Sequence, residues 1–304
     1  MVLTVTCNPA LDYRLAVPRL LAGETNRATE TQLRAGGKGL NVSRMLAAFG
    51  ADTRAVSFSA GDTGAMLETM LAAEPFPTEW IRLPRGRTRI NVKLSDGTET
   101  EINAPGAPVP EEAFGVLAAR VSRLRAGDTL CLCGSLAPGM GADSYARLLA
   151  ATPAEVKTVV DAVGEPLRQA LAHHPFLIKP NRAELSQLAG QALSTLPQAE
   201  QAAQMLRRQG AETVLVSLGG EGALLVTGAG VWYQPAPRGA VRCSVSAGDS
   251  MIAGFLAALS RGEPPVAALR LAVATGSAVA FAGGSVSAET AETVRQQLPP
   301  AEER

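Results

Sequence analysis

Short apolar runs with strand character alternate with longer helical patterns along most of the chain. Three further helices, Ser250–Leu259, Pro265–Ala282 and Ala288–Gln297, are predicted to close it. Strands separated by helices of this length indicate parallel βαβ units, because parallel neighbours need a long crossover connection. The sequence therefore predicts an α/β fold, a doubly wound and mostly parallel sheet flanked by helices. The predicted strands are Val2–Thr6, Thr53–Ser57, Thr129–Cys133, Thr158–Asp161, Phe176–Lys179, Thr213–Ser217 and Ala223–Val226.

Two insertions interrupt this alternation, at about residues 11–33 and 81–103, and both show strand-like alternation with no helix between. In the second, Arg87–Leu94 alternates polar and apolar residues, Ser95-Asp96-Gly97 forms a turn, and Thr98–Ile102 returns, which predicts a hairpin. We expect the insertions to form a small second sheet that acts as a lid on a single domain spanning residues 1–304. The alternative is that they are ordinary edge strands of the main sheet.

Composition excludes several classes of protein. The net charge is zero and only 4% of residues are aromatic, which is unlike a nucleic-acid-binding protein. The four cysteines form no CxxC pair and only two histidines are present, so a structural zinc site is not expected. The N-terminus lacks the charged region and apolar core of a signal peptide, and no transmembrane run is predicted. We expect a soluble cytoplasmic protein with reduced thiols that contacts neither membrane nor nucleic acid.

The segment Ser246–Ser250 places small residues and an aspartate directly before a long apolar helix. The first backbone N–H groups of a helix lack helical partners and lie at its positive end, so they bind phosphate. A carboxylate beside bound phosphate is costly unless it has a task. For Asp249 we expect that task to be taking a proton from a hydroxyl that attacks the phosphate. The alternative is a plain loop-to-helix turn.

Gly36–Val42 is a second glycine-rich segment, in which Lys38 supplies charge and Asn41 can bond two hydroxyls. It lacks the spacing of a Walker A loop, and no GxGxxG follows the first strand. The alternative is an ordinary turn before a helix. Asp12 follows the first strand, where open α/β sheets bind ligands, and suits sugar hydroxyls; in isolation it could equally be a turn residue.

Other candidates follow later strands. Asn181 and Glu184 lie three residues apart, so Glu184 either holds a hydrated magnesium ion through water or completes a helix cap. Arg87 and Arg89 lie two apart on a predicted strand, hence on one face, and could bind a phosphomonoester; exposed surface arginines are the alternative. The remaining strand-end segments are Ser217–Ala223 and Gly134–Gly139. Ser217–Ala223 is either a tight hairpin-like turn or a loop that lies along nucleotide phosphates.

Together these segments resemble the pfkB, or ribokinase-like, carbohydrate kinase family over nearly the whole chain and in the expected order. Gly36–Asn41 resembles its first signature and Ser246–Ser250 its second, although Ser246 stands where the family usually has glycine. Within the family the chain is most similar to bacterial kinases that phosphorylate fructose 1-phosphate at C6, using ATP and Mg²⁺. Kinases of tagatose 6-phosphate and fructose 6-phosphate share most of these motifs and remain alternatives.

The resemblance implies a role for each motif. Asp249 would be the base, and the N–H groups of Ala247, Gly248 and Asp249 would form an anion hole. It also implies a homodimer formed through the lid sheets. The rivals are a non-catalytic sugar-phosphate-binding protein on this fold and a dehydrogenase, whose dinucleotide fingerprint is absent. The other implied residues are Asp12, Gly37 and Asn41 for sugar hydroxyls, Lys38, Arg89, Arg27, Arg87 and Ser135 for the sugar phosphate, Lys179, Asn181, Ser217, Gly219 and Gly222 for ATP, and Glu184 for magnesium.

Overall fold

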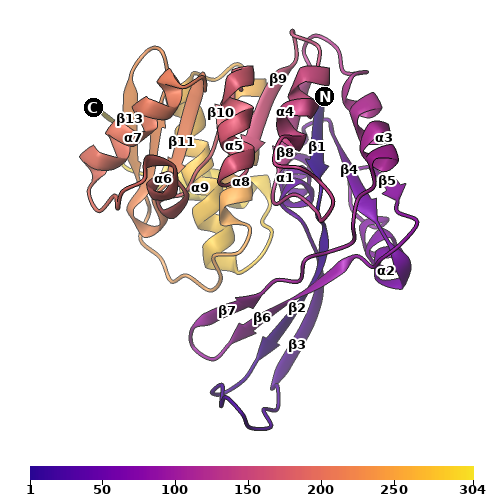
Figure 1. Cartoon of the computed structure of the whole chain (residues 1–304). Helices are drawn as coiled ribbons and strands as arrows, with labels where there is room; N and C mark the ends of the chain where they lie inside the picture. Colours follow the sequence, from indigo (N-terminus) through magenta and orange to yellow (C-terminus); the bar gives the residue numbers. More distant parts are fainter.

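The computed structural model describes residues 1–304 and contains a ten-stranded sheet flanked by helices (Figure 1). Neighbours from β5 to β11 are parallel, and β12, β13 and β14 add an antiparallel edge. The predicted doubly wound fold is therefore confirmed. The strands, in spatial order, are β14 (Glu302–Glu303), β13 (Val231–Pro235), β12 (Gly222–Val226), β11 (Thr213–Ser217), β10 (Leu177–Ile178), β9 (Lys157–Asp161), β8 (Thr129–Cys133), β1 (Val2–Thr6), β4 (Thr53–Ser59) and β5 (Thr78–Arg82).

Helices cover both faces of the main sheet, and each face has its own apolar core. One core contains α3 (Glu111–Val121), α4 (Ser144–Ala151), α5 (Glu165–Ala170), α6 (Arg182–Ala189) and α7 (Leu196–Arg208). The opposite core contains α1 (Lys38–Ala48), α8 (Ala247–Ser260), α9 (Pro265–Ala282) and α10 (Ala288–Gln296). Adjacent strand residues alternate between the cores, as period-two geometry requires. A third cluster packs α2 (Gly61–Leu71) near β4.

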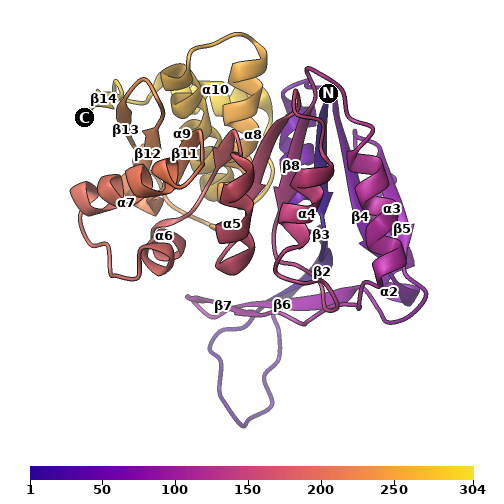
Figure 2. The same cartoon turned by 45° about the horizontal axis from the view of Figure 1, so that its top comes forward.

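A separate four-stranded sheet projects beyond the ends of the central strands, at the bottom of Figure 1 and edge-on in Figure 2. Its order is β3 (Glu30–Gly36), β2 (Ala10–Ala16), β6 (Arg89–Ser95) and β7 (Glu99–Ile102). The two insertions thus form a second sheet, and the edge-strand alternative is wrong. The second insertion starts later than predicted, because Thr78–Arg82 pairs in parallel with β4 and extends the main sheet.

The helix α9 is long and apolar enough to cross a membrane by length and composition. The sequence analysis did not predict a transmembrane run here, because Arg270 and several small residues interrupt the apolar residues of this helix. In the structure most of α9 is buried, packed against α8, α10, β12 and β13. Its apolar character is therefore explained by a position in the protein core.

Two glycines set how closely α8 and α9 approach. A Cβ on Gly254 would lie 2.5 Å from Thr275 Oγ1 and 2.9 Å from the carbonyl oxygen of Leu271. A Cβ on Gly276 would lie 2.7 Å from Met251 Cγ. Because α8 begins at the glycine-rich segment around Asp249, this contact also fixes where that segment lies.

We expect Gly254→Ala to destabilise the protein by about 1–3 kcal/mol, because the added methyl group overpacks a contact made partly by backbone. Gly115→Ala is the matched control, since Gly115 is exposed within α3 and a Cβ there meets nothing within 4 Å. It should be neutral or stabilise by up to about 1 kcal/mol. Chemical denaturation measures both, and equal effects would contradict the packing argument.

Candidate active site

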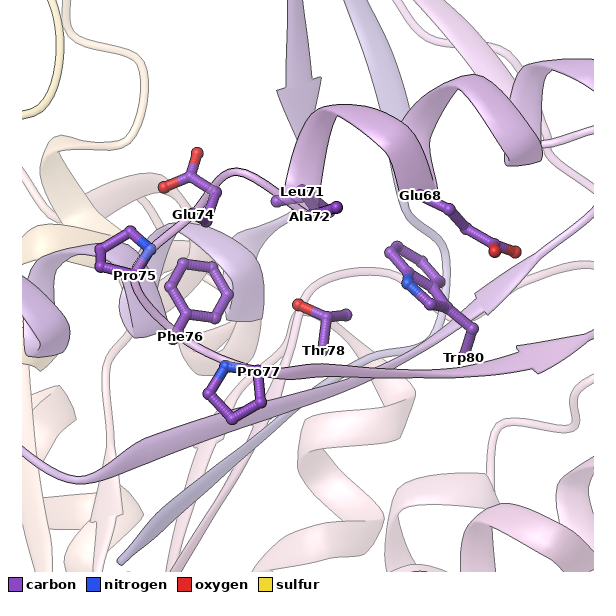
Figure 3. A pocket seen from close by; sticks show the side chains of 9 residues that line it. All are labelled: Glu68, Leu71, Ala72, Glu74, Pro75, Phe76, Pro77, Thr78 and Trp80. Carbon is purple, nitrogen blue, oxygen red and sulfur yellow. The ribbon is translucent and has the colours of Figure 1, made fainter.

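The largest cavity, about 1360 Å³, is lined by residues at the carboxyl ends of central strands and by residues of the small sheet, among them Cys133, Ser217 and Asp12. Every predicted site residue except Arg27 and Arg87 lines it, from both sheets and from the N-termini of α1, α6 and α8. A smaller groove of about 350 Å³ beside β5 contains none of them (Figure 3). The carboxylates of that groove, Glu68 and Glu74, are paired with arginines. The larger cavity is therefore the candidate site.

Arg27 and Arg87 lie elsewhere within the chain. Arg27 is exposed in the loop between β2 and β3, and Arg87 is exposed in the loop before β6. The prediction that Arg87 and Arg89 share a strand face is wrong, because β6 begins only at Arg89. Arg89 does line the cavity, and burial lowers its pKa. Its guanidinium donates to the carbonyls of Asn8 (2.8 Å) and Ala104 (3.2 Å), while Nε has no partner.

The segment predicted to bind an anion lies at the N-terminus of α8, at the cavity wall. Ser246 precedes the helix with φ 68°, a left-handed conformation that favours glycine. Serine tolerates it at a cost of about 1–2 kcal/mol. The N–H groups of Gly248 and Asp249 make no backbone hydrogen bond, whereas Ala247 donates to the carbonyl of Ser244 at 3.2 Å. Two of the three predicted donors are therefore free, and Ala247 is engaged in a turn.

Asp249 is buried, with 6% of its surface exposed, and receives a hydrogen bond from Asn41 Nδ2 at 2.8 Å. Burial raises the pKa of Asp249 to about 6, and the charge of Asp161 adds to the increase. Lys38, Asn41 and Lys179 act in the opposite direction because they stabilise the carboxylate. The side chain is thus ionised at neutral pH but far more basic than an ordinary aspartate, as a general base requires.

Asp161, the last residue of β9, is the main feature that the sequence analysis missed. Its carboxylate is 1% exposed and lies 3.0 Å from Lys38 Nζ and 3.4 Å from Lys179 Nζ. Burial alone would raise the pKa of Asp161, but the two ammonium groups hold it below its usual value. The sequence did contain a signal for Asp161, because it ends an apolar strand. Asp12 was selected as a candidate for its similar position after a strand.

The sugar-side and nucleotide-side candidates face the same cavity. Asp12 Oδ1 accepts a hydrogen bond from Asn91 Nδ2 at 2.9 Å. Asn91 also lines the cavity, and the sequence analysis missed it. Asn181 and Glu184 form a complete capping box at the start of α6, as the structural alternative expected. Only Oε2 of Glu184 takes part in it. Oε1 therefore has no hydrogen-bond partner from the protein, and the magnesium alternative also stays open.

The loop between β11 and β12 holds the remaining residues predicted to bind a nucleotide. Gly219 has φ 61° and Gly222 has φ 117°, and a Cβ on Gly222 would lie 2.7 Å from the backbone nitrogen of Ala236. Ser217 ends β11 at the cavity wall. No group of three or more metal-binding side chains exists in the chain, so the protein offers no complete metal cage.

Comparison with known proteins gives one consistent result. A family model described as pfkB family carbohydrate kinase matches residues 6–291. The 1-phosphofructokinase of Bacillus subtilis is 40% identical over 300 residues, 98% of each chain, and that of Escherichia coli K12 is 35% identical over 90% of this chain and 88% of its own. The crystal structure of Escherichia coli phosphofructokinase-2 with fructose-6-phosphate superposes with a TM-score of 0.90, at 30% identity and 98% coverage of both chains.

We expect Asp249→Asn to be more stable than the native protein at pH 7.5. The folded-state pKa of Asp249 lies above its unfolded value, so ionisation penalises the folded state, by on the order of 1–3 kcal/mol at neutral pH. This penalty disappears as the pH falls through about 6 and towards 4, where both states are protonated. Thermal melting should therefore show a gain of a few degrees that narrows by about pH 5. A constant or negative difference would contradict the raised pKa.

Proposed function

The chain belongs to the pfkB family of carbohydrate kinases, and we propose that its reaction is phosphorylation of fructose 1-phosphate by ATP. The product is fructose 1,6-bisphosphate. The observation that carries this proposal is Asp249, a buried carboxylate with a pKa raised to about 6, placed beside the free N–H groups of a helix N-terminus. Those groups can hold a phosphoryl group while the carboxylate takes the proton of the attacking hydroxyl.

In the proposed step, the C6 hydroxyl attacks the γ-phosphorus of ATP. An oxygen–phosphorus bond forms to C6, the bond to the β-phosphate oxygen breaks, and the hydroxyl proton passes to Asp249. The N–H groups of Gly248 and Asp249 bind the oxygens of the transferring group. Ala247 joins them when its turn to Ser244 opens. Lys179 supplies positive charge next to this point, since its Nζ would lie 3.1 Å from a Cβ on Gly248, and Asp161 holds its ammonium group together with that of Lys38.

The small sheet and α1 are proposed to bind the sugar phosphate. Asp12, Gly37 and Asn41 bind its hydroxyls. Its phosphate is bound by Lys38, Ser135 and Arg89, whose Nε has no partner within the protein. Arg27 and Arg87 are left out of the site, because both lie outside the cavity within one chain.

The opposite wall is proposed to bind MgATP, with Lys179, Asn181, Ser217, Gly219 and Gly222 along the nucleotide. Magnesium neutralises phosphate charge when it arrives with ATP. The residues present fit a hydrated ion better than a direct protein cage, since Glu184 offers one free carboxylate oxygen and no three-ligand group exists. Glu184 would hold that ion through water.

The comparisons favour fructose 1-phosphate over the alternative sugars. The 1-phosphofructokinases match at 40% and 35% identity, whereas the enzyme crystallised with fructose-6-phosphate matches at 30%. Fructose 6-phosphate or tagatose 6-phosphate would enter reversed, with the C1 hydroxyl at Asp249 and the anomeric hydroxyl against the other wall. A buried group left unpaired by that reversal costs about 1–3 kcal/mol. A non-catalytic sugar-phosphate sensor would have no use for the buried base.

We propose that the protein is a homodimer formed through the small sheet, with that sheet acting as a lid on one kinase domain. The strand register places Tyr13, Leu33, Val92, Ile90 and Ile102 on the same face of the sheet. Four of them are exposed in the single chain, and a second copy would cover them. We also propose a cytoplasmic location, where the four free thiols would stay reduced.

Asp249→Asn should lower kcat by at least about 10²–10⁴-fold, because the amide keeps the shape but cannot accept the proton. ATP should still bind with nearly unchanged affinity, which isothermal calorimetry measures alongside the kinetics. A variant that retains more than about a third of the native rate would overturn the role of Asp249.

A sugar panel tests the proposed substrate. At fixed MgATP, kcat/KM for fructose 1-phosphate should exceed that for fructose 6-phosphate and tagatose 6-phosphate at least about tenfold, the value of one unpaired buried group. Coupled detection of ADP measures all three. If a 6-phosphate is the best substrate, the chain is a kinase of the same family with a different specificity.

A further inference from the structure

Asn41 contributes the single side-chain hydrogen bond that reaches the Asp249 carboxylate, from Nδ2 to Oδ2 at 2.8 Å. A side-chain amide carries an oxygen at one end and an NH₂ group at the other, and the two ends have nearly the same shape. Rotated by half a turn, Asn41 would present its oxygen to Asp249, and attraction would become repulsion. The orientation of this amide therefore decides the surroundings of the base.

Arg44 determines that orientation. Its Nη1 donates to Asn41 Oδ1 at 2.9 Å, and because a guanidinium has donors only, it can face only the oxygen end of the amide. Arg44 follows Asn41 by three residues on α1, so the two side chains lie on the same face of the helix. With the oxygen held by Arg44, the NH₂ group points to Asp249.

Glu74 in turn holds Arg44. Its Oε1 lies 2.9 Å from both Nε and Nη2 of Arg44, and the pair is largely buried, with side chains 18% and 23% exposed. Glu74 lies in the turn after α2, where its N–H donates to the carbonyl of Leu71. Figure 3 shows Glu74 at the end of the groove beside β5, with its carboxylate turned away from Trp80. A hydrogen-bonded chain thus runs from this turn to the base.

We propose that Arg44, held by Glu74, is a positioning residue that orients the Asn41 amide toward Asp249. The inference rests on the proposed role of Asp249 as the base. The charged groups that shift the pKa of Asp249 are Lys38 from α1, Asp161 from β9 and Lys179 after β10. Arg44 donates to neither oxygen of Asp249, and the contact that links it to the carboxylate is its hydrogen bond to Asn41 Oδ1.

The test is Arg44→Met, which keeps a long side chain but removes every donor. A hydrogen bond to the carboxylate lowers its pKa, so its loss should raise the pKa of Asp249 and move the acidic limb of the kcat/KM profile up by about 0.5–1 pH unit. The KM for ATP should change less than about twofold. Carbon-13 NMR of labelled aspartate gives the same shift without turnover, with the Asp249 signal assigned by its absence in Asp249→Asn.

Three matched variants separate positioning from general damage. Arg44→Lys keeps a donor and should restore most of the native profile, and Glu74→Gln keeps a neutral acceptor and should lie between native and Arg44→Met. Arg120→Met removes the Arg120–Glu79 pair (3.2 Å), which lies between α3 and β5 and away from the cavity. Arg120→Met should change neither the acidic limb of the kcat/KM profile nor the NMR titration of Asp249.

An unchanged Asp249 titration in Arg44→Met, whatever happens to its melting temperature, would overturn the proposal. If Arg44→Met does not fold, Glu74→Gln decides in the same way, since an unshifted titration there also contradicts it. If the native protein phosphorylates no sugar phosphate, the proposed function fails. The NMR titration still tests the hydrogen-bonded chain in that case.

Discussion

The site depends on one buried carboxylate and the two ammonium groups that neutralise it. Asp161 is almost fully buried, and an unpaired charge there would cost several kcal/mol, so Lys38 and Lys179 must stay within reach. This ties the end of β9 to the start of α1 and to the segment after β10. It also leaves one net positive charge beside the N-terminus of α8. The proposed phosphate site thus lies where charge balance already demands cations, and Asp249, with its pKa raised to about 6, remains ionised at neutral pH despite its burial.

The two sheets divide the chemistry between them. In the proposed mechanism the main sheet and its helices supply the base Asp249, the free N–H groups of α8 and the two lysines. The small sheet supplies Asp12 and Arg89, which face the same cavity from the other side. Specificity can therefore change in the small sheet without disturbing proton transfer. The same arrangement makes the site costly, because the buried Asp249 and the left-handed Ser246 both destabilise the fold that holds them.

The sequence analysis predicted correctly those features that depend on residues close together in the chain. Strand and helix alternation predicted the main sheet, and glycine-rich segments before helices predicted the N-termini of α1 and α8, since both depend on neighbours in sequence. Tertiary pairing was missed. Nothing near Asp161 in sequence reveals two lysines, and nothing near Asn41 reveals that Arg44 is held by Glu74. Arg87 was misplaced because alternation does not show where a strand begins, and β6 starts two residues after Arg87. The family resemblance supplied the roles, which spacing alone left open.

The central claim is that Asp249 is a base whose pKa is set by burial and by this cluster of charges. The most direct measurement compares, in the native protein, the pH dependence of kcat/KM for fructose 1-phosphate with the NMR titration of the Asp249 carboxyl. The account predicts one ionisation near pH 6 in both, because the pKa is raised to about 6. A carboxyl that titrates near its ordinary value of about 4, or an acidic limb that persists unchanged in Asp249→Asn, would contradict it.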